Sequence, residues 1–122
     1  MVRVIIAGSR SFNDWELLSN SVHDILLNYD TDELEIVSGG CSGADKMGEE
    51  YAEEWGIKCT VFQADWNKYG VAAGPIRNNQ MGEYASKSNH GMLIAFPVGI
   101  SKGTRNMINL AKRYGLEVHV VE

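Results

Sequence analysis

Five short apolar runs alternate along the chain with longer segments of helical periodicity. The runs cover residues 2–7, 34–37, 57–62, 91–96 and 116–121. Nearly continuous apolar runs of this length are typical of strands buried on both faces of a parallel sheet. Because strands that alternate with helical segments form right-handed βαβ units, we expect an α/β, Rossmann-like three-layer sandwich. Its five-stranded sheet should be mainly parallel, with helices on both faces.

The first two helical segments carry recognisable start and stop signals. Asn13, with Glu16 three residues later, is the expected cap of the first helix. Ser42 is expected to cap the second helix, which should end at Gly56. The acidic run from Glu49 to Glu54 is interpreted as the solvated face of that second helix.

Two further helices are expected in the second half of the chain. The third should begin at Pro75, a residue suited to a first helical turn, and the last should run from about Thr104 to Gly115. Residues 65–74 show no clear period. They predict a long loop, and loops of this length in compact domains are often functional.

Composition limits the size and the partners of the protein. The chain has 122 residues, of which 44% are hydrophobic, so we expect one domain over residues 1–122. The formal net charge of -5 disfavours a nucleic-acid partner, which would call for a basic face. Local basic groups remain suitable for a small anionic ligand.

The cysteines and the chain start favour a cytoplasmic protein. Cys41 and Cys59 are too few for a disulfide scaffold and lack metal-ligand spacing. The first apolar run is far shorter than a membrane span and has no cleavage-site pattern, so no membrane association is expected. The three histidines are scattered over a helix, a loop and a strand. We therefore predict no metal site, no catalytic triad and no cofactor.

Four stretches that follow the strands carry the candidate chemistry, namely Gly8–Arg10, Ser38–Asp45, Asp65–Gly74 and Pro97–Thr104. A parallel sheet would gather them at its carboxyl edge, where such folds bind ligands. Two of the stretches contain glycines before a helix, an arrangement that offers N–H groups and a partial positive charge to an anion. The spacing G-G-x-x-G is neither a dinucleotide fingerprint nor a P-loop.

The two glycine turns are expected to contact different parts of the ligand. Gly39, Gly40 and Gly43 suit either a tight turn or ligand binding, and we favour ligand binding. Asp45 would repel a nearby phosphate, so its expected role is to contact a sugar. The turn Lys102–Thr104 suits the phosphate better.

Several side chains have both a structural and a functional interpretation. Arg77 is expected to clamp a phosphate or diphosphate, whereas for Arg10 a surface role and a ligand role are equally supported. Trp66 and Tyr69 suit either the core or a stacking face for a base. Cys41 is better explained as a small tolerated side chain than as a nucleophile, since no histidine is near it in sequence.

These residues resemble the YspA-related branch of the SLOG superfamily over almost the whole chain. The resemblance rests on Gly8-Ser9-Arg10 with Phe12 and Asp14, Ser38-Gly39-Gly40 with Gly43-Ala44-Asp45, Trp66, Tyr69-Gly70, Ala73-Gly74, Arg77-Asn78, Met81, Ala95-Phe96-Pro97 and Lys102-Gly103-Thr104. The superfamily includes LOG-type phosphoribohydrolases, DNA-processing protein A and nucleotide-sensing domains. The resemblance implies a Rossmann-like domain that binds nucleotides or nucleotide-derived ligands.

One departure from the phosphoribohydrolases bears on catalysis. Those enzymes carry a catalytic glutamate three residues after the threonine of the second glycine turn, where this chain has Met107. A thioether can neither move a proton nor stabilise an oxocarbenium-like centre as a carboxylate does. Arg77 resembles the arginine of those enzymes, but its acidic partner is missing from the matching position.

The leading hypothesis is a sensor or sequestering protein for an ADP-ribose-like ligand or a mononucleotide. The alternatives are an N-glycosidic hydrolase of nucleoside monophosphates, using Asp14, Asp45 or Glu83, and a less favoured single-stranded nucleic-acid binder. A homodimer is expected, because domains of this family commonly pair. The expected ligand-binding residues are Gly8, Ser9, Arg10, Ser38, Gly39, Gly40, Gly43, Ala44, Asp45, Trp66, Tyr69, Gly74, Arg77, Asn78, Pro97, Ser101, Lys102, Gly103 and Thr104.

Overall fold

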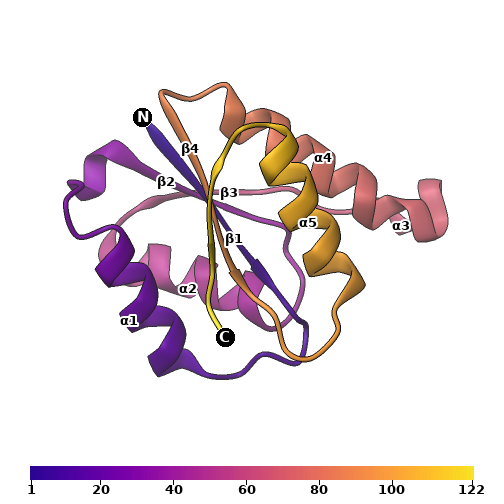
Figure 1. Cartoon of the computed structure of the whole chain (residues 1–122), viewed down its shortest axis with the longest axis horizontal. Coiled ribbons are helices and arrows are strands. Elements are labelled where there is room, and N and C mark those ends of the chain that lie inside the picture. The colour runs from indigo at the N-terminus through magenta and orange to yellow at the C-terminus, as the bar shows by residue number, and fades with distance from the viewer.

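The computed structural model describes residues 1–122 and contains one five-stranded sheet (Figure 1). The strands are β1 (Val2–Gly8), β2 (Leu34–Ser38), β3 (Lys58–Val61), β4 (His90–Phe96) and β5 (Glu117–Val120). They lie in the order β3-β2-β1-β4-β5, and every neighbouring pair is parallel. Each strand begins and ends within one residue of its predicted bounds. The prediction of a Rossmann-like α/β fold is confirmed.

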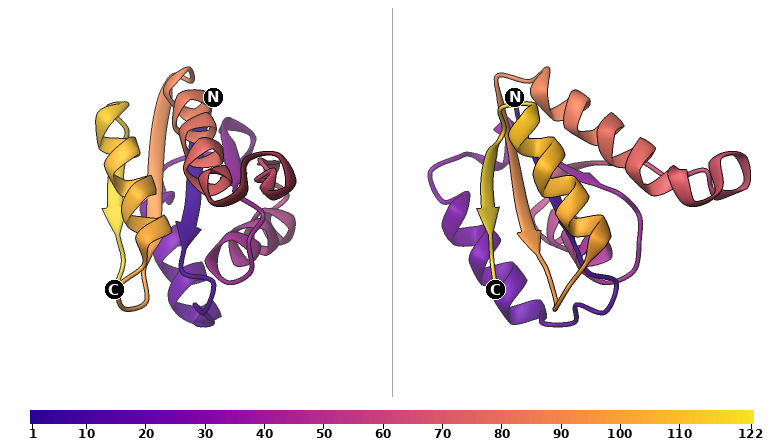
Figure 2. Two further views of the ribbon diagram at one scale, coloured as in Figure 1. Left: turned by 90° about the vertical axis from the view of Figure 1, so that its right-hand side faces the viewer. Right: turned by 45° about the vertical axis from the view of Figure 1, so that its right-hand side comes forward.

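Helices cover both faces of the sheet. Helices α1 and α2 lie against one face, and α4 and α5 lie against the other (Figure 2). The helices are α1 (Trp15–Ile25), α2 (Ala44–Trp55), α3 (Trp66–Tyr69), α4 (Ala73–Ser86) and α5 (Lys102–Arg113), with the 3₁₀ helices η1 (Thr31–Glu33) and η2 (Gly70–Ala72). None of them combines the length and the apolar character needed to cross a bilayer.

The central position of β1 in the sheet explains why its sequence is almost continuously apolar. Val4 and Ile6 point into the core beneath α1 and α2, whereas Ile5 and Ala7 point into the core beneath α4 and α5. Successive side chains of a strand face opposite sides of the sheet, so a strand covered on both sides needs apolar residues at every position.

Two predicted helix caps are wrong. Asp14, rather than Asn13, caps α1, because its carboxylate accepts the Leu17 N–H at 3.0 Å. Ser42 does not cap α2 either; Gly43 occupies the cap position, with a φ of 80° and no side-chain hydrogen bond. A glycine is required at that point, because a Cβ on Gly43 would lie 2.3 Å from the carbonyl oxygen of Ser9.

The predicted long loop over residues 65–74 is also wrong. Those residues form α3, η2 and the start of α4, and the Asp65 carboxylate caps α3 by accepting the Lys68 N–H at 3.1 Å. Helix α4 begins at Ala73, so Pro75 lies within its first turn. Helices of one turn have too few positions to display a period, which is why their sequence resembles a loop.

The strand order places a topological switch point beside β1. From β1 the chain moves outward through β2 and β3, then returns to the other side of β1 with β4 and β5. The loops that leave β1 and β4 are joined at their starts, where the Val98 N–H donates to the Ser9 hydroxyl at 2.8 Å, and then lead to α1 and α5 on opposite faces of the sheet. The switch point is the place where open α/β sheets bind ligands.

Candidate functional site

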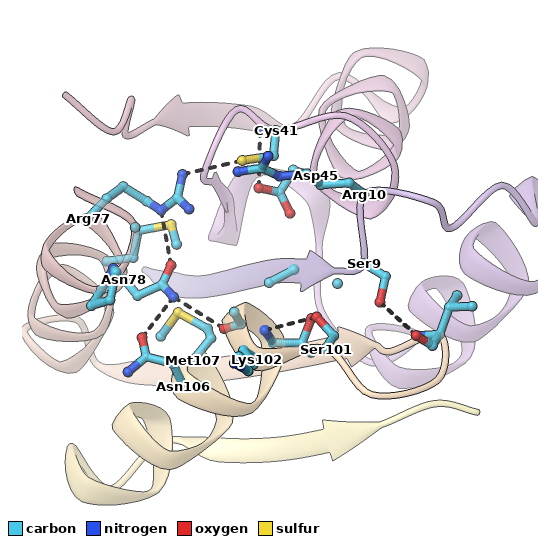
Figure 3. A pocket seen from close by; sticks show the side chains of 18 of the residues that line it. Ser9, Arg10, Cys41, Asp45, Arg77, Asn78, Ser101, Lys102, Asn106 and Met107 are labelled. Carbon is cyan, nitrogen blue, oxygen red and sulfur yellow. Dashed lines mark hydrogen bonds between the residues drawn. The ribbon is translucent and has the colours of Figure 1, made fainter. Parts of the chain in front are cut away.

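A cavity of about 610 Å³, the main cavity, opens at the carboxyl ends of β1 and β4, between α4 and α5 (Figure 3). Its volume is in the range usual for small-molecule sites. The structure brings these predicted ligand residues to its wall: Gly8, Ser9, Arg10, Asp45, Trp66, Gly74, Arg77, Asn78, Ser101, Lys102, Gly103 and Thr104.

The remaining predicted ligand residues lie elsewhere. Gly39 and Gly40 line a smaller cavity of about 240 Å³, the second cavity. Pro97 borders a separate depression with Arg105. The predicted residues that line none of these three are Ser38, Gly43, Ala44 and Tyr69.

The first glycine turn is partly occupied by hydrogen bonds within the protein. The Gly40 N–H donates to the Ser38 hydroxyl at 3.1 Å, and the Cys41 N–H donates to the Asp45 carboxylate at 3.2 Å. The Ala44 N–H donates to the Ser9 carbonyl oxygen at 3.4 Å, and fully buried Ser38 donates to Glu49 at 2.7 Å. Glu49 is thus tied to the turn and is not simply part of a solvated face. The Gly40, Cys41 and Ala44 N–H groups therefore already have acceptors within the protein, whereas the N–H groups of Asp45 and Lys46 in the first turn of α2 have none.

The second glycine turn places the start of α5 in the wall of the main cavity. Ser101 caps α5, with its hydroxyl accepting the Thr104 N–H at 3.3 Å and contacting the Thr104 hydroxyl at 2.8 Å. The N–H groups of Lys102 and Gly103, in the first turn of α5, have no acceptor within the protein. Such groups carry the partial positive charge of the helix and can bind an anion.

Arg77 is buried and faces the main cavity from α4 (Figure 3). Its Nε donates to Asn78 Oδ1 at 3.0 Å, and its Nη1 donates to the Gly39 carbonyl oxygen at 2.5 Å and lies 3.7 Å from Cys41 Sγ. Its Nη2 makes no hydrogen bond within the protein. The guanidinium is therefore held in one orientation with donor capacity left over.

Asn78 links α4 to α5 across the floor of the cavity. Its side-chain amide donates to the Gly103 carbonyl oxygen at 3.3 Å and to Asn106 Oδ1 at 3.0 Å. Asn106 lines the cavity but was not predicted. Its position one helical turn after Lys102 and Gly103 was the signal that could have identified it.

Asp45 is a buried acid within the wall of the main cavity. Burial is the largest influence and raises its pKa from 3.8 to about 6, against the opposing effects of the Cys41 N–H and the Arg77 charge. A carboxyl group with such a pKa changes charge near neutral pH, and carboxyls of this kind are common at functional sites.

The mouth of the cavity is apolar and was largely missed by sequence reasoning. Val71 is 94% exposed and Ile100 is 86% exposed, and both line the cavity together with Val98 and Trp66. The Arg10 guanidinium lies 5.6 Å from the centre of the Trp66 indole ring. Large exposed apolar side chains around one opening often mark a ligand or partner contact.

The acidic residues near the cavity differ in their access to it. Met107 is buried and lines the cavity at the position where the phosphoribohydrolases carry their glutamate. Asp14 caps α1 and Glu83 pairs with Lys87 on the surface of α4, so neither lines the cavity. Asp45 does. No group of three His, Cys, Asp or Glu side chains is placed to hold a metal ion.

Comparison with known proteins finds a similar sequence in a phage protein and a similar fold in a bacterial protein. It is 33% identical over 129 residues to the Gene 61 protein of Mycobacterium phage D29, covering 97% of this chain and 94% of that protein. The fold is similar to DNA processing protein A (DprA) from Streptococcus pneumoniae, with a TM-score of 0.73 and 16% identity. That likeness covers 98% of this chain but only 50% of the DprA chain.

The match to a family model covers the N-terminal part of the chain. Residues 2–69, which include β1, β2, β3 and the first glycine turn, match the YspA, cpYpsA-related SLOG family. Together with the phage relative, this match confirms the resemblance seen in the sequence. The chain belongs to the YspA, cpYpsA-related SLOG family.

Proposed function

We propose that the protein binds a nucleotide or nucleotide-derived ligand in the main cavity and acts as a sensor or sequestering protein. The observation that carries the proposal is the pairing of two anion-binding groups across one cavity. The unpaired N–H groups of Lys102 and Gly103 lie on α5, and the held guanidinium of Arg77 lies on α4. Both kinds of group are suited to phosphate.

We assign a part of the ligand to each wall of the main cavity. The phosphate would lie at the start of α5, within reach of Lys102 and Arg77. Asn78 and Asp45 would contact the sugar. The apolar rim around Trp66 would hold the base, because an indole offers a flat surface for stacking.

Lys102→Ala is the variant that tests this proposal. Lys102 is exposed and has no hydrogen bond or ion pair, so its removal should leave the unliganded protein almost unchanged. We would measure melting temperatures with the mono- and diphosphates of the common nucleosides, NAD and ADP-ribose. A ligand that binds only the folded state raises the melting temperature, and Lys102→Ala should reduce that rise.

Lys112→Ala is the matched control, since Lys112 is an exposed lysine in the last turn of the same helix. It should leave the ligand-induced rise intact. The proposal is abandoned if no phosphorylated compound stabilises the wild-type protein.

N-glycosidic hydrolysis of nucleoside monophosphates is the second candidate function, and one observation favours it. Asp45 lines the main cavity with a pKa near 6, suitable for a general acid that protonates the departing base while water attacks the anomeric carbon. The products would be the free base and ribose 5-phosphate. Chromatography after long incubation tests this, with Asp45→Asn as the inactive comparison. A bound nucleotide recovered intact would exclude hydrolysis.

We also propose that the protein forms a homodimer. Tyr69 and Val71 lie on α3 and η2, which project from the body of the molecule (Figure 1), and both side chains are exposed. Exposed apolar residues on a projecting arm favour contact with another chain. Sedimentation analysis of the wild-type protein and of Val71→Asp tests this, because a dimer formed through the arm should dissociate in the variant. A wild-type protein that sediments as a monomer would contradict the proposal.

A further inference from the structure

The second cavity is a neighbour of the main cavity, and the residues common to the walls of both form a partition between them. Arg10, Cys41, Trp66 and Arg77 line both cavities. The residues that line only the second cavity are Gly39, Gly40, Ser42, Gln63 and Ala64. The two spaces are therefore neighbours separated by four side chains.

The charge of the second cavity favours an anion. Arg10 and Arg77 bring two positive charges to it, and no carboxylate lines it. The Gln63 side-chain amide lies close to Gly40, because a Cβ built there would be 2.8 Å from Gln63 Nε2. Gln63 is exposed and makes no hydrogen bond within the protein, so its N–H groups are available to a ligand.

The partition is fixed on one side and adjustable on the other. Arg77 is buried and bonded to Gly39, so it stays in place. Arg10 and Trp66 are both exposed, and they contact each other only through the guanidinium and the indole ring. A ligand that interacts with both arginines can extend from one cavity into the other without disturbing the core.

We propose that the second cavity receives a second anionic group of the same ligand, so that the ligand class is a nucleoside diphosphate or a pyrophosphate-linked derivative rather than a nucleoside monophosphate. This inference rests on the proposed function. One phosphate lies at the start of α5 in the main cavity, and the next is held between Arg77, Arg10 and the Gln63 amide. Two guanidinium groups are suited to the two phosphates of such a chain.

Gln63→Glu tests the inference by placing one negative charge in the second cavity. Gln80→Glu is a matched control, because Gln80 is an exposed glutamine on α4 that lines none of the cavities described above. Calorimetric titration would use the mono- and diphosphate of whichever nucleoside binds best. We expect tighter binding of the diphosphate to the wild-type protein.

Gln63→Glu should weaken diphosphate binding at least about fivefold, as a like charge at short range does, and should change monophosphate binding less than about twofold. Gln80→Glu should change neither. Equal affinities of the wild-type protein for mono- and diphosphate, or equal losses of both in Gln63→Glu, would overturn the inference and leave the proposed function standing. Failure of every nucleotide to bind the wild-type protein would overturn both.

Discussion

Arg77 Nη1 donates a hydrogen bond of 2.5 Å to the carbonyl oxygen of Gly39, across 38 residues of sequence. The bond ties α4 to the turn that follows β2. A Cβ on Gly39 would lie 2.8 Å from both Arg77 Nη1 and Asp45 Oδ2, so only glycine fits between these two side chains. Arg77 thus has a structural partner as well as a face toward the main cavity.

Arg77→Ala should destabilise the unliganded protein. Loss of a buried charged donor leaves the Gly39 carbonyl oxygen and Asn78 without their partner, which costs about 1–3 kcal/mol in the free energy of unfolding. Urea denaturation without ligand measures this. Arg105→Ala, which removes an exposed arginine from α5, should change the midpoint little. Equal midpoints for Arg77→Ala and wild type would show that Arg77 serves only the ligand.

Glu35→Gln should destabilise the fold, because Glu35 is the acceptor of a buried cluster on β2. Its carboxylate accepts bonds from Thr60 at 2.6 Å, Tyr84 at 2.5 Å and Arg3 at 3.3 Å, with Lys58 at 3.8 Å. Burial raises the Glu35 pKa, but these partners outweigh it and hold the pKa below 4.5. We expect a loss of about 1–3 kcal/mol at pH 7.

The pH dependence of Glu35→Gln follows from the direction of that shift. An acid with a lowered folded pKa stabilises the fold above its ordinary value and loses that contribution as the pH falls through the folded pKa. The difference between wild type and Glu35→Gln should therefore shrink below about pH 4.5. Glu83→Gln, an exposed control, should show little difference at any pH. A pH-independent difference would point to packing instead of charge.

Asp45→Asn should have the opposite pH dependence. The Asp45 pKa is raised to about 6, so between pH 3.8 and 6 the folded state binds more protons than the unfolded state. Wild-type stability should fall as the pH rises through this range, and Asp45→Asn should reduce that fall. Denaturation curves at several pH values check this. An unchanged slope in the variant would mean that Asp45 titrates normally.

Gly43→Ala should be far more harmful than Gly56→Ala, although both glycines have positive φ. The new Cβ at Gly43 would lie 2.3 Å from the Ser9 carbonyl oxygen, whereas at Gly56 nothing lies within 4 Å. We expect about 1 kcal/mol for Gly56→Ala from the left-handed backbone alone and more than about 3 kcal/mol for Gly43→Ala. Similar losses would show that Gly43 is needed only for its backbone angle.

Local pattern was sufficient for the strands and for much of the candidate site. The apolar runs predicted all five strands, and the parallel topology then brought Arg77, Asn78 and Lys102 to one cavity. The local pattern of apolar and polar residues was insufficient to predict the short helices. Helices α3 and η2 span one turn each, so residues 65–74 carried no periodic signal.

The hydrogen-bond partners of buried Glu35 could not be predicted from the local sequence pattern. Its partners come from β1, β3 and α4, and they meet only because the sheet order places β2 between β1 and β3. A charged residue within an apolar run is tolerated there because each of its bonds is supplied by another element.

The sequence by itself determined the alternation of strands and helices, because apolar periodicity and glycine turns act over a few residues. Only the tertiary structure decided which N–H groups of the two glycine turns are paired within the protein and which turn lines the main cavity. In the first turn the N–H groups of Gly40, Cys41 and Ala44 donate to Ser38, Asp45 and Ser9, whereas the unpaired N–H groups at the start of α5 belong to residues that line the main cavity. Whether an N–H group is available depends on acceptors that folding brings from distant parts of the chain.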